Sequence, residues 1–153
     1  MTGATVEKKY KIAFICTGNT CRSPMAQFIM RHKLKLAGVN GVLVKSFGTK
    51  AHGSPMKDET KFVLKTLKIP YSKFTSKPLP KNLNAFDAVV CMTAEHKRAL
   101  IGMAENLYTF DELFKAGDVP DPYGKDQAAY FEAAKIIYAC CEKMIGYLRS
   151  GRL

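Results

Sequence analysis

The sequence predicts a single α/β domain in which helices flank a parallel β-sheet. Short apolar segments of the kind that form buried strands alternate along the chain with segments of helical periodicity. Strands connected through helices run parallel and make right-handed crossovers. The chain has 153 residues, which suits one core. We therefore expect one domain over residues 1–153, with a flexible N-terminal tail at 1–9.

Four segments are typical of strands because each is short, apolar and bounded by polar or small residues. They are Lys11–Cys16, Val42–Phe47, Ala85–Met92 and Leu107–Phe110. With helices between them, they predict a three-layer fold whose four-stranded parallel sheet lies between helices. Ligands of such sheets bind beyond the carboxyl ends of the strands, and the first strand places Cys16 at that edge.

The first helix has clear signals at both ends. Ser23 offers an N-cap hydroxyl, Pro24 suits the first helical position, and Gly38 ends the helix. Further helices are expected from Pro55 to Leu67, from Thr93 to about Gly102, and from Asp126 to Arg149. The last of these has an apolar stripe formed by Tyr130, Ala133, Ile137, Cys141, Met144 and Leu148.

Two segments read as irregular. Tyr71–Leu83 contains Pro78 and Pro80, and Gly117–Gly124 contains both proline and glycine. No apolar segment approaches the ~18 residues of a membrane-spanning helix, and the first apolar run is too short for a signal peptide. We therefore expect a cytoplasmic protein with no membrane span.

The formal net charge is +11, from 24 basic and 13 acidic residues. Such a charge implies an anionic partner, whether a phosphorylated protein, a nucleic acid or lipid headgroups, or simply a well-solvated basic surface. The lysines are scattered, and no basic run exceeds Lys8-Lys9. No nucleic-acid-binding motif is present, so we expect no specific nucleic-acid partner.

The five cysteines are expected to be free thiols, because their number is odd and no secretory signal precedes them. They are Cys16, Cys21, Cys91, Cys140 and Cys141. No C-x2-C motif of the zinc-binding type occurs, and His32, His52 and His96 lie far apart in the sequence. The sequence therefore predicts neither a metal site nor a cofactor.

The informative segment, C-T-G-N-T-C-R-S-P, spans Cys16 to Pro24 between a strand and a helix. A loop in that position can direct successive backbone N–H groups inward and bind an anion, with the helix N-terminus adding its positive end. Gly18 would allow a backbone angle that a side chain resists. The planar guanidinium of Arg22 suits two oxygens of one phosphate.

Cys16 would lie at the start of this loop, among N–H dipoles and beside Arg22. These surroundings lower the pKa of a thiol and make a nucleophile, so attack on phosphorus would give a cysteinyl-phosphate. Asp121, in the D-P-Y-G segment before the last helix, is the candidate proton donor and later base. Tyr123 beside it could stack on an aromatic substrate.

C-T-G-N-T-C-R-S-P followed about 100 residues later by D-P-Y-G resembles the low-molecular-weight protein tyrosine phosphatase family across nearly the whole chain. The resemblance implies Cys16 as nucleophile, Arg22 as phosphate clamp and Asp121 as general acid. It also implies supporting roles for Asn19, Ser23 and Ser46, with oxidation of Cys21 against Cys16 as a further family trait. The phosphate-binding loop would comprise Thr17, Gly18, Asn19, Thr20, Cys21, Arg22 and Ser23.

The sequence departs from the family pattern at two positions. Lys45 stands where many members have Asp, and Lys73 where many eukaryotic members have a histidine that braces the loop asparagine. Phe47 and His52 are candidates for the substrate wall. The expected partners are a phosphotyrosine protein or small aryl phosphate, with inorganic phosphate or another oxyanion in the loop.

Two alternatives remain open at this point. A thioredoxin-coupled arsenate reductase of the same fold would need a resolving cysteine pair. Cys91 lies within a predicted buried strand, and Cys140 and Cys141 point different ways on a helix. A non-catalytic phosphate-binding module would not need a nucleophile, a clamp and an acid together.

Overall fold

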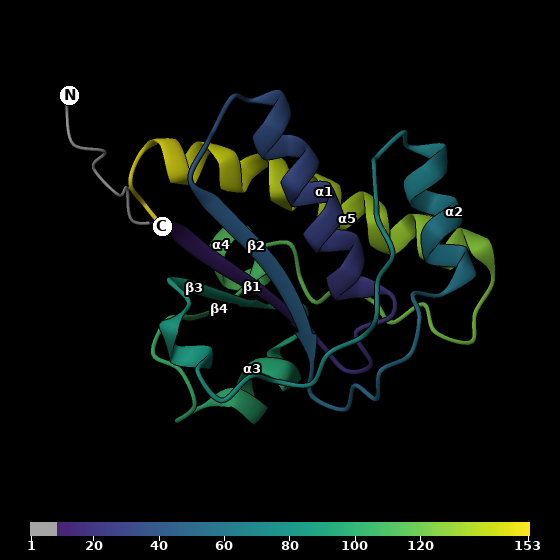
Figure 1. Ribbon diagram of the computed structural model, residues 1–153, viewed down its shortest axis with the longest axis horizontal. Helices are drawn as coiled ribbons and strands as arrows, with labels where there is room; N and C mark the ends of the chain where they lie inside the picture. Colours follow the sequence, from purple (N-terminus) through teal and green to yellow (C-terminus); the bar gives the residue numbers. More distant parts are fainter. Residues whose placement is uncertain (1–8) are drawn as a thin grey trace.

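The computed structural model describes residues 9–153 as a parallel sheet with helices on both faces (Figure 1). The tail expected at 1–9 lies, apart from Lys9, outside the described residues. The sheet has four strands in the order β2-β1-β3-β4, and every pairing between them is parallel. This confirms the predicted fold class and places β1 in the interior of the sheet.

The strands are β1 (Tyr10–Cys16), β2 (Val42–Gly48), β3 (Ala88–Cys91) and β4 (Leu107–Thr109). The helices are α1 (Arg22–Leu36), α2 (Asp58–Thr66), α3 (Ala94–Leu100), α4 (Phe110–Phe114) and α5 (Gln127–Arg149), with a 3-10 turn at Leu83–Ala85. Along β1 the side chains alternate between the two faces: Phe14 enters the larger core and Ile15 the smaller one.

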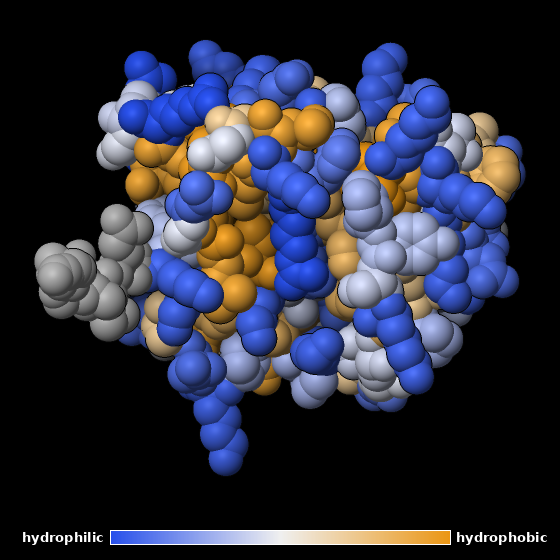
Figure 2. All heavy atoms as spheres, turned by 45° about the horizontal axis from the view of Figure 1, so that its top comes forward, coloured by the Kyte–Doolittle hydropathy of each residue, from blue (hydrophilic) through white to orange (hydrophobic). Residues whose placement is uncertain are grey.

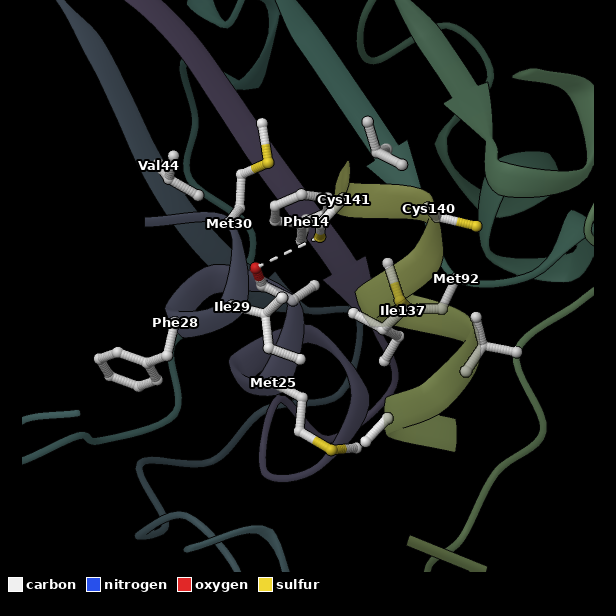
Figure 3. Close-up of a cluster of buried hydrophobic side chains, with 14 of the residues drawn as sticks. Phe14, Met25, Phe28, Ile29, Met30, Val44, Met92, Ile137, Cys140 and Cys141 are labelled. Atoms are coloured by element: carbon white, nitrogen blue, oxygen red, sulfur yellow. Dashed lines mark hydrogen bonds between the residues drawn. The ribbon is translucent and has the colours of Figure 1, made fainter. Parts of the chain in front are cut away.

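The larger core lies between the sheet and the layer formed by α1 and α5 (Figure 1). Side chains from both helices meet over the sheet in Figure 3, where the thiol of Cys141 donates to the carbonyl of Ala26 on α1 at 3.9 Å. Tyr130, Ile137 and Met144 of the predicted α5 stripe are buried, and Leu148 is partly buried. On the face shown in Figure 2, hydrophilic residues surround patches of hydrophobic surface.

The smaller core lies on the opposite face, under α3 and the 3-10 turn. Ala13, Ile15, Val89 and Cys91 of the strands pack there with Leu83, Phe86 and Leu100. Phe47 also lies in this core, with its ring edge-on to Phe86 at 5.6 Å between centroids. Phe47 therefore lies in the core and not in the substrate wall, where it was expected from the sequence.

The C-terminal end of α1 agrees with the sequence prediction, and the N-terminal end does not. Gly38, at φ +67°, follows the C-cap Ala37, and Val39 N donates to Leu34 O at 3.0 Å, as in a Schellman motif. At the N-terminus the prediction is wrong. The N-cap is Cys21 rather than Ser23, and it makes no side-chain capping bond.

Other element boundaries also differ from the sequence prediction. The second helix begins at Asp58 rather than Pro55, because Pro55 pairs with Thr75 in an isolated bridge. β3 is shorter than 85–92, since the 3-10 turn occupies its expected start.

The fourth strand ends one residue early, because α4, a helix not expected from the sequence, begins at Phe110. There Thr109 and Glu112 form a capping box that starts a helix at Phe110.

Candidate active site

The segment 16–22 curls between the end of β1 and the start of α1. β1 is hydrogen-bonded to β2 on one side and β3 on the other, so Cys16 emerges at the middle of the carboxyl edge. Asn19 has φ +55°, the left-handed conformation that lets the loop reverse. Gly18 does not have such an angle, and an added Cβ would only contact Thr20 Oγ1 at 3.6 Å. The expected role of Gly18 therefore falls to Asn19.

The thiol of Cys16 is buried at the bottom of this loop and lies 2.9 Å from the hydroxyl of Ser23. Burial raises the pKa of Cys16 above its ordinary value. The hydroxyl and backbone N–H of Ser23, the Arg22 guanidinium and the backbone N–H of Asn19 act in the opposite direction. The lowered pKa expected from the sequence is not found, because burial outweighs the neighbouring groups that stabilise the thiolate.

Asn19 holds the loop through its side-chain amide. Its Nδ2 donates to Ser23 Oγ at 2.7 Å and to Ser46 Oγ at 3.0 Å, and its Oδ1 accepts from Lys77 N at 2.9 Å. Ser46 in turn donates to Gln27 Oε1 at 2.6 Å. All these side-chain groups are buried and hydrogen-bonded, which makes the loop rigid.

The backbone of Lys77 explains one departure from the family pattern. It supplies the partner of Asn19 that many eukaryotic members take from a histidine, while Lys73 is exposed. Lys45, the other departure, is also exposed. Neither lysine lines the cavity above Cys16.

Arg22 is buried, and two groups from the late loop, residues 117–124, hold its guanidinium. One is a backbone carbonyl and the other is a carboxylate. Nη1 donates to Val119 O at 3.1 Å, and Nη2 lies 3.5 Å from Asp121 Oδ2. The other carboxylate oxygen of Asp121 accepts from the backbone N–H of Tyr123 at 3.1 Å. Residues about 100 positions apart in sequence therefore meet at one edge of the sheet.

A cavity of about 550 Å³ opens above the loop. The loop residues Cys16 to Arg22 form its floor, and Asp121 and Tyr123 form one wall. Residues 50–58 supply further lining residues, among them Lys50, His52 and Lys57. The exposed Tyr123 lies beneath the ammonium of Lys57, 4.8 Å from its ring centroid. Of the three residues expected in the substrate wall, Tyr123 and His52 line the cavity and Phe47 does not.

Gly48 lets β2 approach the phosphate loop closely. Thr49 N donates to Cys16 O and Lys50 N to Thr17 O, both at 2.9 Å. A Cβ on Gly48 would lie 2.4 Å from Thr17 O. The pattern β-strand–Gly–Thr was visible in the sequence, but the close approach depends on pairing with a distant segment.

The sequence analysis also missed two side chains that support the loop. His96 on α3 lies with Nε2 2.8 Å from Thr17 Oγ1, and its own helix cap, Thr93, contacts Nδ1 at 3.0 Å. Gln27 on α1 accepts from Ser46. The only sequence signal for His96 is its place in the first turn of a helix that follows a buried strand.

Of the remaining cysteines, Cys21 lines the cavity, whereas Cys91, Cys140 and Cys141 do not. Cys21 donates to the hydroxyl of Tyr130 at 3.5 Å. Burial raises the pKa of Cys91 to about 12 and that of Cys140 to about 11, and it raises that of Cys141 well above the ordinary value. These three are therefore poor thiolates, which disfavours a redox relay.

Residues 9–153 contain no cluster of three or more side chains that could hold a metal ion. None of their helices is long and apolar enough to cross a membrane. The cavity brings together a cysteine, an arginine and an aspartate: Cys16, Arg22 and Asp121.

Comparisons with known proteins agree with this geometry. A family model described as low molecular weight phosphotyrosine protein phosphatase matches residues 11–152. The low molecular weight protein-tyrosine-phosphatase PtpA of Staphylococcus epidermidis is 32% identical over 148 residues, covering 90% of this chain and 92% of the relative.

Two solved structures show the same arrangement of elements. The low molecular weight protein tyrosine phosphatase of T. tengcongensis has a TM-score of 0.83 and 35% identity, covering 90% of this chain and 99% of the other. The YwlE arginine phosphatase of Geobacillus stearothermophilus has a TM-score of 0.83 and 30% identity, covering 94% and 95%. With its anion loop, its buried cysteine and its D-P-Y-G segment, the chain belongs to the low molecular weight phosphotyrosine protein phosphatase family.

Proposed function

We propose that the protein hydrolyses phosphotyrosine or aryl phosphate monoesters through a phosphoenzyme on Cys16. The observation that carries this proposal is the meeting of Cys16, Arg22 and Asp121 around one cavity. The backbone N–H groups of residues 17–23 and the Arg22 guanidinium would bind the phosphoryl oxygens. Tyr123, exposed at the cavity mouth, would contact the aromatic ring of the substrate.

In the first step, the Cys16 thiolate attacks phosphorus and the bond from phosphorus to the leaving oxygen breaks. Asp121 donates its proton to that oxygen, so the alcohol or phenol leaves neutral. In the second step, the Asp121 carboxylate takes a proton from water as the water oxygen attacks phosphorus. The S–P bond breaks, inorganic phosphate leaves and the Cys16 thiolate is restored.

The thiolate depends on the groups around it, because burial alone favours the neutral thiol. Ser23 donates to the sulfur when the sulfur carries the charge, and Arg22 balances that charge. Asn19 orients the Ser23 hydroxyl by donating to it, which leaves the hydroxyl hydrogen free for Cys16. Ser46 and Gln27 hold Asn19 in place.

The first experiment is release of phosphate from an aryl phosphate, with chelator and reductant present. We expect turnover in the wild type and in the control Cys140→Ala, whose thiol is buried on α5, and none in Cys16→Ser. Rapid acid quench should trap phosphate on the wild type and not on Cys16→Ser. A folded wild type without turnover would exclude the catalytic proposal and leave a phosphate-binding module.

Phosphoarginine is a second candidate substrate. Two arginine phosphatases named YwlE share the fold at TM-scores of 0.84 and 0.83, with 28% and 30% identity. The carboxylates of Asp58 and Asp121 line the cavity and would favour a guanidinium leaving group. Comparing kcat/KM for phosphotyrosine and phosphoarginine in the same peptide discriminates the two candidates.

We also infer a reducing compartment such as the cytoplasm, since all five cysteines are free thiols.

A further inference from the structure

A buried histidine contacts the phosphate loop from α3, outside the proposed reacting groups. The His96 side chain has little exposure, with 6% of the residue accessible, and its Nε2 lies 2.8 Å from Thr17 Oγ1. Thr17 directly follows Cys16 and lines the cavity. The contact therefore joins α3 to the loop residue next to the nucleophile.

The contacts of Thr93 favour the ring tautomer of His96 that carries its proton on Nε2. Thr93 Oγ1 accepts from the backbone N–H of His96 at 3.1 Å and lies 3.0 Å from Nδ1. A hydroxyl that accepts one hydrogen bond still has a hydrogen to donate, and among residues 9–153 Nδ1 is the acceptor within its reach. When Nδ1 accepts that hydrogen, the ring proton is on Nε2. The opposite tautomer would leave the Thr93 hydrogen without that acceptor.

With its proton on Nε2, His96 donates to Thr17 Oγ1, so the Thr17 hydroxyl must turn its own hydrogen elsewhere. No second protein partner of this hydroxyl occurs in the described part of the chain. The open side of Thr17 is the cavity. The hydroxyl hydrogen is therefore available to an anion bound there.

The charges around His96 keep the ring neutral, which preserves this arrangement. Arg22 faces it from the phosphate loop, while Glu95 on α3 and Asp118 and Asp121 on the late loop are the nearby carboxylates. Burial, followed by Arg22, lowers the pKa of His96 to about 4. At neutral pH the imidazole therefore has one proton and one acceptor nitrogen.

We propose that His96 is a positioning residue, which donates to Thr17 Oγ1 and so directs the Thr17 hydroxyl as an additional donor to the bound oxyanion. The inference rests on the proposed function in taking that oxyanion to be the phosphoryl group. Two contacts carry it, from Thr93 to Nδ1 and from Nε2 to Thr17. Thr17 touches the substrate, while His96 acts through Thr17.

The test measures the dissociation constant of inorganic phosphate by calorimetry, together with kcat/KM for an aryl phosphate. We expect Thr17→Val and His96→Phe each to weaken phosphate about tenfold, equal to about 1.4 kcal/mol, and Thr17→Ser to bind as the wild type does. The double variant should bind no more weakly than Thr17→Val, because both changes remove one donor. Arg98→Gln, an exposed change on the same helix, is the control.

Three results would overturn the inference. The first is wild-type phosphate affinity in Thr17→Val, and the second is full additivity in the double variant. ¹⁵N NMR of His96 in the wild type reads the tautomer without any substitution, and a proton on Nδ1 would also exclude it. If the wild type binds phosphate but does not hydrolyse aryl phosphates, the proposed function fails while the calorimetry still decides this inference.

Discussion

Gly48→Ala should disrupt the contact between β2 and the phosphate loop. The new Cβ would lie 2.4 Å from Thr17 O and 3.0 Å from the Cβ atoms of Asn19 and Ala51. The first of these neighbours is backbone, so no side chain can rotate away. An ordinary contact begins at 3.4 Å, which requires the two backbone segments to separate by about 1 Å.

That separation costs stability in two ways. Overpacking of this kind costs ~1–3 kcal/mol. It would also lengthen the two hydrogen bonds that join 49–50 to the loop, each worth ~1 kcal/mol. We expect a loss of about 3 kcal/mol in the free energy of unfolding, or roughly 10 °C in Tm for a domain of this size.

Thermal unfolding and kcat/KM of three glycine variants provide the measurement. Gly18→Ala should change Tm little, because its Cβ would contact only Thr20 Oγ1 at 3.6 Å. Gly146→Ala, with nothing within 4 Å and a helical position, should gain ~1 kcal/mol. A Gly48→Ala protein that melts within about 2 °C of wild type would refute the packing argument.

Three further predictions concern other parts of the molecule. His96 has a pKa lowered to about 4, so its contribution to stability is present above the unfolded value near 6.5 and is lost as the pH falls toward 4. Urea unfolding should show a loss of about 1–2 kcal/mol between pH 7 and pH 5 that is absent in His96→Gln; equal pH profiles would contradict this. Lys57→Gln should lower kcat/KM about 2–5-fold for peptides with aspartate beside the phosphorylated residue, since the ammonium lies at the cavity mouth. Small aryl phosphates and the exposed control Lys135→Gln should show no such loss, and an equal effect on both substrates would rule out charge recognition. Thr109→Ala should cost about 1–2 kcal/mol in urea unfolding by removing the capping box of α4, and unchanged stability would disprove that role.

Much of the fold could be predicted because its signals are local. The apolar run before Cys16 reads as a buried strand, and the hydroxyl of Thr93 caps α3 as expected. Errors occur where a distant segment competes for the same residues. Pro55 is a good first helical residue, but pairing with Thr75 keeps it extended, and α2 starts three residues later.

In the candidate site, too, local features could be predicted from the sequence and contacts between distant segments could not. The spacing from Cys16 to Arg22 could be read directly, because both residues lie on one continuous loop and helix. The contact of His96 with Thr17 spans 79 positions and has no sequence pattern. The burial that raises the pKa of Cys16 likewise comes from the assembled fold, whereas the dipoles that oppose it are local. Phe47 was expected in the substrate wall, but the register of β2 turns its side chain into the smaller core.

The two groups that hold the Arg22 guanidinium are synthesised long after Arg22 itself. Arg22 is made early in the chain, but the carbonyl and carboxylate that fix its guanidinium belong to Val119 and Asp121. A polypeptide that ends before these positions contains the thiol of Cys16 but lacks both groups that hold the Arg22 guanidinium. Under the proposed mechanism, such a truncated product would also lack its proton donor and would not turn over phosphate esters.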